Sequence, residues 1–454
     1  QAKGDCFGIL NLSIDDFVQS GDMYYLPRAA RDDEPSCDSD SPLSALANFW
    51  ENRELSASRR ETKEAAVGIL TLIGSLAGHK TNVSPLSEFD VAPLVNAMSL
   101  GADASHAAMS CALQLYHAGA MTPECLVQAM RLEDDPGADA VVSRLTPPSQ
   151  GSVGESSSPP ASKEELELVQ TAAALVIAMA PAEGAVELLF GAVQPLVRAL
   201  RTEASRSTAL RGDDVSITQM VAFRAVLNCK TTNWKKELET KNYQRAQDAA
   251  REAGAAESLA DLLKPDMDSP LRDPALADRN ARVTQCALGA IAAFCAQNPA
   301  NRKAMRCSGD GYTLKRVVDL LSPDQPDGCA AHAAVALVHL AAQNASLYFD
   351  EEARESRMQI EEYGGLNALA ALWAHHGYDG PAGLNSPVAT AAERGLYELA
   401  LGGFEDHVAK AKRAARMGKL KWREGPEQWA KVLHEMDPPR AGDVKVHVGD
   451  FYLE

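Results

Sequence analysis

The chain has 454 residues and a formal net charge of −18. General binding to nucleic acid or to anionic membranes needs a basic face, so this acidic composition disfavours both kinds of partner. Apolar residues make up 46% of the sequence but aromatic residues only 6%, which indicates an interior of small side chains, as helix-on-helix packing requires. No uninterrupted apolar run reaches the roughly 18 residues that a membrane-spanning helix needs.

Nine cysteines are present and none forms a CxxC pair. An odd number of cysteines in a long chain argues against a disulfide framework, and free thiols are typical of a reducing, intracellular compartment. The chain does not begin with Met, so a cytoplasmic protein and an organellar protein are both compatible with the sequence.

The N-terminal segment, residues 1–42, has an acidic, Ser- and Pro-containing stretch that cannot bury enough surface to fold by itself. We expect an extended arm there. From residue 43 the apolar residues follow a helical period, with a buried helix expected near 65–76 and Pro93 in the first turn of another. Residues 43–145 therefore form a first predicted helical block.

A low-complexity stretch rich in Ser and Pro, residues 146–163, predicts a linker or long loop. At its end, Ser162 and Glu165 have the spacing of a capping box, so a helix should begin directly after Ser162. A second helical block is predicted over 164–436. The remaining residues, 437–454, alternate Val with polar residues before Phe451 and Tyr452, which favours an extended tail that docks through these two aromatic side chains.

A repeated phrase runs through both blocks: a turn that contains small residues or Gly, then a short apolar helix that ends in two large residues. The closing pairs end at residues 98, 130, 200, 263, 321 and 373. A second phrase has an Ala-Leu core followed by Asn; its best copy runs from Ala287 to Cys295 and continues into Asn298, Asn301, Arg302 and Lys303, and another runs from Ala336 to Asn344.

On these phrases the sequence resembles the armadillo family, most clearly over residues 250–400. The resemblance implies an all-α fold, a right-handed α-solenoid of three-helix repeats whose stacked units share one core and present a long protein-binding surface. Armadillo proteins that bind basic signal segments carry a regular ladder of Trp and Asn. The five Trp residues here do not recur in register, so a nuclear transport role is not expected.

Motifs for catalysis or cofactor binding are absent from the sequence: there is no Walker A sequence, GxGxxG, HExxH, GxSxG or zinc-type spacing. His332 and His339 could share a helix face, but a metal would need further ligands, so we predict structural histidines. Cys307 has no evident activating partner. Asp266, Asp268 and Asp273 depart from the calcium-loop pattern. The sequence therefore predicts no catalytic, cofactor-binding or metal-binding residue.

A basic segment is the sharpest charge feature, since residues 407–423 hold no acidic residue in a chain of net charge −18. An acidic partner could bind there, whereas a solvated terminal helix is the simpler alternative. Together with Phe451 and Tyr452, the predicted partner-binding residues are Lys410, Lys412, Arg413, Arg416, Lys419, Lys421 and Arg423.

The resulting hypothesis is a non-catalytic protein-binding scaffold, a structural subunit of a larger assembly. Ciliary axonemes contain armadillo proteins as fixed parts, so the resemblance adds the cilium to the candidate locations. The alternative is a regulatory adaptor that binds transient peptide partners in the concave groove of the solenoid. Constant stoichiometry with one partner would favour the scaffold, and reversible peptide binding would favour the adaptor.

Overall fold

The structure is a computed structural model, and it describes residues 60–78, 87, 92–99, 101–131, 137–146, 161–206, 211–229, 242–264, 274–342, 350–377 and 386–400. All regular structure in these ranges is helical, as the all-α prediction requires. The chain divides into two compact units between Leu188 and Leu189. The predicted five-segment organisation stays a prediction, because most of its boundaries lie in residues outside these ranges.

The first unit contains α4 (Arg60–Ala77), α6 (Ala92–Met98), α7 (Ala102–His117), α8 (Pro123–Ala129), α9 (Gly137–Ser143) and α10 (Lys163–Met179). Helix α7 packs against α4, α6 and α10, and α6 packs against α9. The capping box at the start of α10 is confirmed: Ser162 Oγ accepts from Glu165 N at 3.2 Å and Glu165 Oε2 accepts from Ser162 N at 2.8 Å. The short helix α11 (Ala185–Leu189) reaches the boundary between the units.

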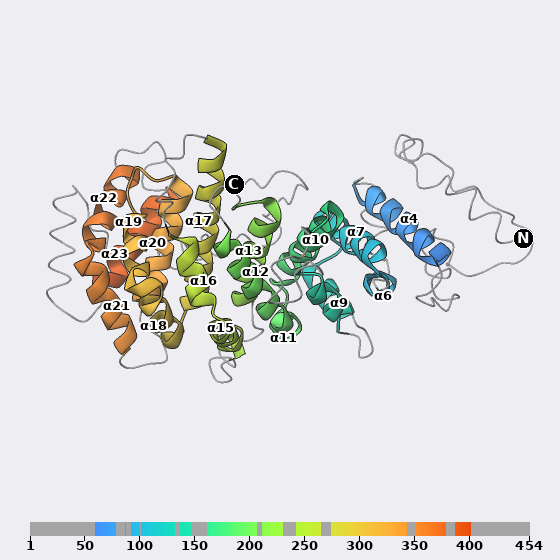
Figure 1. The fold of residues 1–454 in the computed structure, drawn as a ribbon, viewed down its shortest axis with the longest axis horizontal. Helices are drawn as coiled ribbons and strands as arrows, with labels where there is room; N and C mark the ends of the chain where they lie inside the picture. Colours follow the sequence, from blue (N-terminus) through green and yellow to red (C-terminus); the bar gives the residue numbers. More distant parts are fainter. Residues whose placement is uncertain are drawn as a thin grey trace, which may run out of the picture. The chain divides into compact units, whose positions relative to one another are not determined.

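The second unit is built from groups of three helices, which Figure 1 shows in order from green to red. After the short turn η4 (Phe190–Ala192) come α12 (Val193–Ser205) and α13 (Asp214–Leu227). Three complete groups follow: α15 (Asn242–Glu252), α16 (Ala255–Leu262) and α17 (Pro274–Cys295); α18 (Pro299–Cys307), η6 (Gly309–Gly311), α19 (Thr313–Asp319) and α20 (Asp327–Ala341); and α21 (Glu351–Glu362), α22 (Gly365–Gly377) and α23 (Pro387–Ala400).

Equivalent helices of successive groups stack on one another in three rows. The first row is α15, α18 and α21, and the second row is α12, α16, α19 and α22. The third, which we call the long-helix row, is α13, α17, α20 and α23, where each helix packs against the next. This arrangement confirms the predicted armadillo-like helical repeat, because every group shares its core with its neighbours.

Alanine lines the contacts within the long-helix row. Helix α20 lies between α17 and α23, and its buried residues include Ala330, Ala333, Ala334 and Ala336. With such small side chains the helix backbones approach closely, as the low aromatic content indicated. We call this contact zone the alanine seam.

Glycine turns open second-row helices, as the repeated phrase predicted. Gly254 precedes α16 with φ of +85° and Gly364 precedes α22 with φ of +82°. Both values lie in the left-handed region, which glycine adopts without the steric cost that a Cβ would add. The arginine Arg201 on α12 secures one of these turns, since its Nη2 donates to the Ala253 carbonyl at 2.8 Å.

The asparagines that followed the Ala-Leu phrase hold three helices together. Asn298 Oδ1 accepts from Asn301 N at 3.1 Å and so caps α18. Asn301 Nδ2 donates to the carbonyls of Phe294 at 2.9 Å and Gln247 at 3.1 Å, which joins α17 to α15. Gln247 Nε2 donates to the Ala293 carbonyl at 2.7 Å near the end of α17. These Asn side chains therefore satisfy buried backbone groups between repeats. Asn344, in the other copy, lies outside the described residues.

Candidate functional site

The predicted partner-binding residues, those of the basic segment 410–423 with Phe451 and Tyr452, all lie outside the residues that the structure describes. They stay predictions. The search for a site in the described residues therefore begins with side chains that are accessible and lie together on one face of the repeat array.

The long-helix row has such a face. On α20 the residues Gly328, His332, Val335 and His339 recur at helical spacing and are all half-exposed, whereas the residues on the other sides of this helix are mostly buried. Each neighbouring helix adds half-exposed residues: Val221, Arg224 and Ala225 on α13, Arg282 and Gln285 on α17, and Glu393 and Arg394 on α23. We call this surface the long-helix face.

An arginine and a histidine meet across this face. Arg224 Nη1 lies 3.5 Å from His332 Nε2, although the two residues belong to helices on either side of α17. The α17 residue between them is Gly289, where an added Cβ would come within 3.0 Å of Arg224 Nη1 and 3.2 Å of His332 Cδ2. The missing side chain at Gly289 is therefore what allows the two residues to meet.

The hydrogen bonds of His332 fix its tautomer. Its Nδ1 lies 2.8 Å from the Gly328 carbonyl oxygen, which can only accept, so Nδ1 carries the proton. In the neutral ring Nε2 is then an acceptor for Arg224. Burial and the Arg224 charge lower the pKa of His332 to about 4, so the ring is neutral near pH 7.

His339 lies about two turns further along α20, and its pKa is lowered in the same direction. Burial lowers its pKa to about 4, and the charges of Arg224, Arg394 and Arg302 act in the same direction. Both histidines are therefore neutral near pH 7, and their predicted structural role stays a prediction. Among the described residues, no group of three His, Cys, Asp or Glu side chains could hold a metal ion.

Acidification should weaken the second unit through these two histidines. Their folded pKa values of about 4 lie below the unfolded value of 6.5. Between these values the unfolded chain binds more protons, so stability is full above about pH 6.5 and falls as the pH drops toward 4. We expect the urea midpoint, followed by circular dichroism, to fall between about pH 7 and 5. A His332→Gln/His339→Gln variant should show a shallower fall, and an unchanged slope would contradict this origin.

The other charged residues on or beside the long-helix face are already paired. Arg394 forms an ion pair with Glu398 on the same helix, and Arg282 Nη2 lies 3.3 Å from Asp214 Oδ1 on α13. Burial raises the pKa of Glu398 even though Arg394 and Arg357 oppose the rise.

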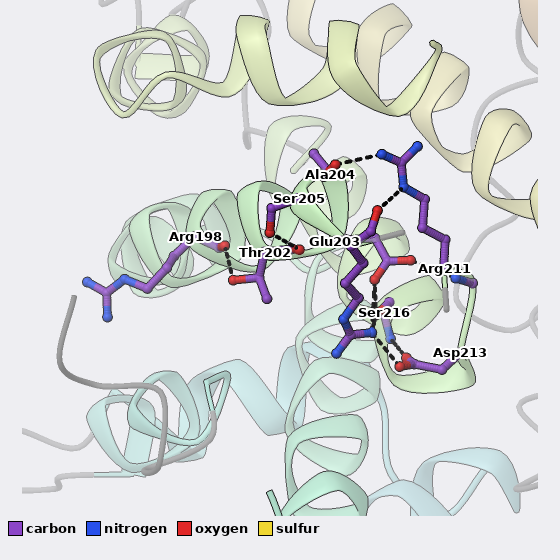
Figure 2. Close-up of polar contacts among 10 residues, drawn as sticks. Arg198, Thr202, Glu203, Ala204, Ser205, Arg211, Asp213 and Ser216 are labelled. Atoms are coloured by element: carbon purple, nitrogen blue, oxygen red, sulfur yellow. Dashed lines mark hydrogen bonds and ion pairs between the residues drawn. The ribbon is translucent and has the colours of Figure 1, made fainter. Parts of the chain in front are cut away.

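A second polar cluster joins α12 to α13 (Figure 2). The Glu203 carboxylate, 2% exposed, accepts from Gly212 N at 2.6 Å, from Ser216 Oγ at 2.9 Å and from Arg206 Nη1 at 3.0 Å. Asp213 caps α13 by accepting from Ser216 N at 2.7 Å. Although a buried carboxylate can be catalytic, this one is held by three donors and lies against the protein's own backbone. Its role is to join the end of α12 to the start of α13.

Arg211 completes this cluster from the other side. Its Nε donates to the Arg206 carbonyl at 3.1 Å and its Nη2 to the Ala204 carbonyl at 2.6 Å, and Figure 2 shows it lying over the end of α12. Positive charge at a helix C-terminus is favourable because the last carbonyl groups have no partner within the helix. The cluster is therefore a structural junction.

The cysteines in the described residues are unpaired. Burial raises the pKa values of Cys111 and Cys229 to about 12, which disfavours the reactive thiolate form at these two positions. Cys307 is exposed at the end of α18, and the predicted absence of an activating partner stays a prediction. The three aspartates of the weak calcium pattern lie outside the described residues.

The structure describes one of the five tryptophans. Trp373 is buried in α22, in the second row and away from the long-helix face, and the other four Trp residues lie outside the described residues. In the part of the chain that the structure describes, no helix has the length and apolar character to cross a membrane.

Comparison with known proteins gives structural matches only. No family model and no curated protein matches the sequence. Among solved structures, an engineered protein is 20% identical, with 69% of this chain and 98% of that chain covered and a TM-score of 0.46. A designed armadillo repeat protein is 19% identical over 66% of this chain and 98% of its own, with a TM-score of 0.42.

Another designed armadillo repeat protein, solved in complex with the peptide (KR)4, is 19% identical over 68% of this chain and 99% of its own, with a TM-score of 0.45. The repeat architecture of this chain rests on its own helix contacts.

Proposed function

We propose that this chain is a non-catalytic protein-binding scaffold, a structural subunit of a larger assembly that binds its partner along the long-helix face. One observation carries the proposal: half-exposed residues recur on α13, α17, α20 and α23 as one surface that crosses successive repeats. A surface of this length suits an extended segment of a partner protein. The polar clusters behind it serve to hold the repeats together, which supports a fixed platform.

We infer the cellular compartment from the cysteines. The free cysteines in the described residues support a reducing compartment, with the cytoplasm, the cilium and an organelle as candidates. The basic segment 410–423 and the residues Phe451 and Tyr452 remain our proposed secondary contacts, the former for an acidic partner. The second candidate function, a regulatory adaptor for transient peptides, would use the same long-helix face.

Purification of the tagged full-length chain from its source cells, followed by native mass spectrometry, tests the scaffold. We expect one set of partners at constant stoichiometry, since a fixed subunit stays bound through the purification. Val335→Tyr adds uncharged bulk to the long-helix face and should release the partner. Ala371→Tyr makes a comparable addition at an exposed position of α22 and should not. A chain that purifies alone as a monomer would refute the scaffold, and exchange with added peptides would favour the adaptor.

A further inference from the structure

Two arginine side chains are buried near each other where α18 packs against α21. Arg302 on α18 is 0% exposed and Arg357 on α21 is 6% exposed. Burial lowers the pKa of Arg357, and the charge of Arg302 acts in the same direction, whereas Glu398 and Asp350 oppose both effects. Like charges that are buried close together repel each other, because little water screens them. This pair of arginines therefore requires negative charge beside it.

The two carboxylates that act on Arg357 are engaged by other arginines. Asp350 forms an ion pair with Arg302, and Glu398 forms one with Arg394. Within the described ranges, Arg357 itself forms no ion pair, and its one hydrogen bond goes to a backbone carbonyl oxygen. A buried guanidinium group is thus left without a carboxylate of its own, which is an unfavourable state for a charge.

Both arginines also carry buried N–H groups that need an acceptor. Among the residues that the structure describes, Arg357 Nη2 and the Nε and Nη1 of Arg302 are buried without a hydrogen-bond partner. Each guanidinium group is held from another side: Arg357 Nε donates to the Ala341 carbonyl oxygen at 2.7 Å, and Arg302 Nη2 donates to Asp350. Buried donors without an acceptor are unfavourable. The arginines therefore match a small acceptor that carries negative charge.

We propose that Arg302 and Arg357 bind a small monovalent inorganic anion, such as chloride, between α18 and α21. Both residues are more than nine-tenths buried, so a partner's side chain or a phosphorylated ligand cannot reach them, whereas a single ion can enter when the helices open locally. The ion would accept charge-assisted hydrogen bonds from both guanidinium groups. It would also join two successive repeats, which share their stability through such contacts. This site is independent of the proposed partner-binding function.

Hydrogen exchange of the full-length protein in sodium chloride and in sodium gluconate, at equal ionic strength, tests the site. Gluconate is too large for a site buried between two helices, so it serves as the reference anion. A ligand that binds only the folded state raises protection by the factor 1 + [L]/Kd, so the α18 and α21 amides should gain about tenfold protection when chloride reaches about ten times its Kd. Bromide should act in the same way. The amides of α12 and α13, which belong to an earlier repeat, should not respond.

One variant removes the site and a matched variant leaves it. Arg357→Met removes the charge that has no carboxylate and keeps a long side chain, so the variant should fold, and chloride should change the exchange of α18 and α21 less than about twofold. Lys303→Met removes one positive charge beside Arg302, but the Lys303 side chain is 63% exposed. The chloride response should therefore remain in Lys303→Met.

Equal exchange of α18 and α21 in chloride and in gluconate would overturn the anion site and assign the buried N–H groups to water. A chloride response that survives in Arg357→Met, or that extends equally to α12 and α13, would overturn it too, since a general salt effect acts on every helix. Circular dichroism reports whether each variant is folded. If Arg357→Met does not fold, Arg357→Lys takes its place: it keeps the charge but has a single nitrogen, and it should reduce the chloride response at least about threefold. An undiminished response in Arg357→Lys would then overturn the site.

Discussion

Replacing Glu203 with Ala should destabilise the segment around α12 and α13 by about 3 kcal/mol. The change leaves the Gly212 N–H and the Ser216 hydroxyl without their buried acceptor, while Arg206, 29% exposed, keeps its ion pair with Asp213. Leaving buried donors unpaired costs more than the hydrogen bonds contribute, because the donors have lost their water as well. Glu203→Gln retains one acceptor oxygen and should have a smaller effect.

The measurement is hydrogen exchange of α12 and α13 amides, combined with a denaturant midpoint, since repeat arrays need not unfold in one step. Thr202→Ala is the matched control, because Thr202 Oγ1 donates only to the Arg198 carbonyl of its own helix, at 3.0 Å. We expect that control to stay within about 0.5 kcal/mol of the parent chain. If Glu203→Ala behaved like Thr202→Ala, the cluster would not be a structural junction.

Replacing Asp350 with Ser is expected to cost about 3 to 5 kcal/mol in the region of α18 and α21. Arg302, with a side chain 0% exposed, pairs with Asp350, which is 1% exposed. Asp350 also caps α21 by accepting from Ala353 N at 3.0 Å, and Ser can replace it in that role. The substitution therefore removes the charge while it keeps the cap, so the loss reports on a buried arginine without its counter-ion.

A second substitution makes this test decisive. In the described part of the chain, Arg302 Nε and Nη1 have no acceptor even with Asp350 in place, and burial lowers the pKa of Arg302 although Asp350 raises it. Such a pair contributes little net stability compared with apolar side chains. Arg302→Met combined with Asp350→Ser should therefore recover most of the loss, as measured by hydrogen exchange of α18 and α21.

The control for this pair is Lys303→Ala. Lys303 Nζ lies 3.5 Å from Glu352 Oε1, and the lysine side chain is 63% exposed. An ion pair in water is worth less than about 1 kcal/mol. A double variant that was no more stable than Asp350→Ser alone would show that Arg302 does more than neutralise Asp350.

Local signals in the sequence predicted the helices well. Ser162 and Glu165 fixed the start of α10 because both hydrogen bonds of a capping box lie within one turn. The Ala-Leu phrase predicted α17 and α20, and glycine turns marked α16 and α22. The closing pair at 130 likewise falls at the end of a short helix, because α8 spans Pro123–Ala129 and Met130 is its C-cap.

The candidate site could not be predicted in the same way. Arg224 and His332 are separated by 108 residues, and no local pattern brings them together. Their contact depends on the stacking of α13, α17 and α20, and on a glycine that looked like an ordinary small residue of a buried helix. The sequence singled out both histidines, and the structural role predicted for them stays a prediction. The residues that we selected for charge lie outside the described part of the chain.

The alanine seam limits which amino-acid substitutions this protein can accept in evolution. Ala330, Ala333 and Ala334 are fully buried on α20, which packs against both α17 and α23, so a larger residue at these positions would overpack the core. Accepted mutations should therefore be rare along α17, α20 and α23 and frequent at the exposed ends of the first-row helices. The surface that we propose for partner binding is carried by the helices with the least freedom to vary, so new binding specificity has to arise from the few half-exposed positions between those alanines.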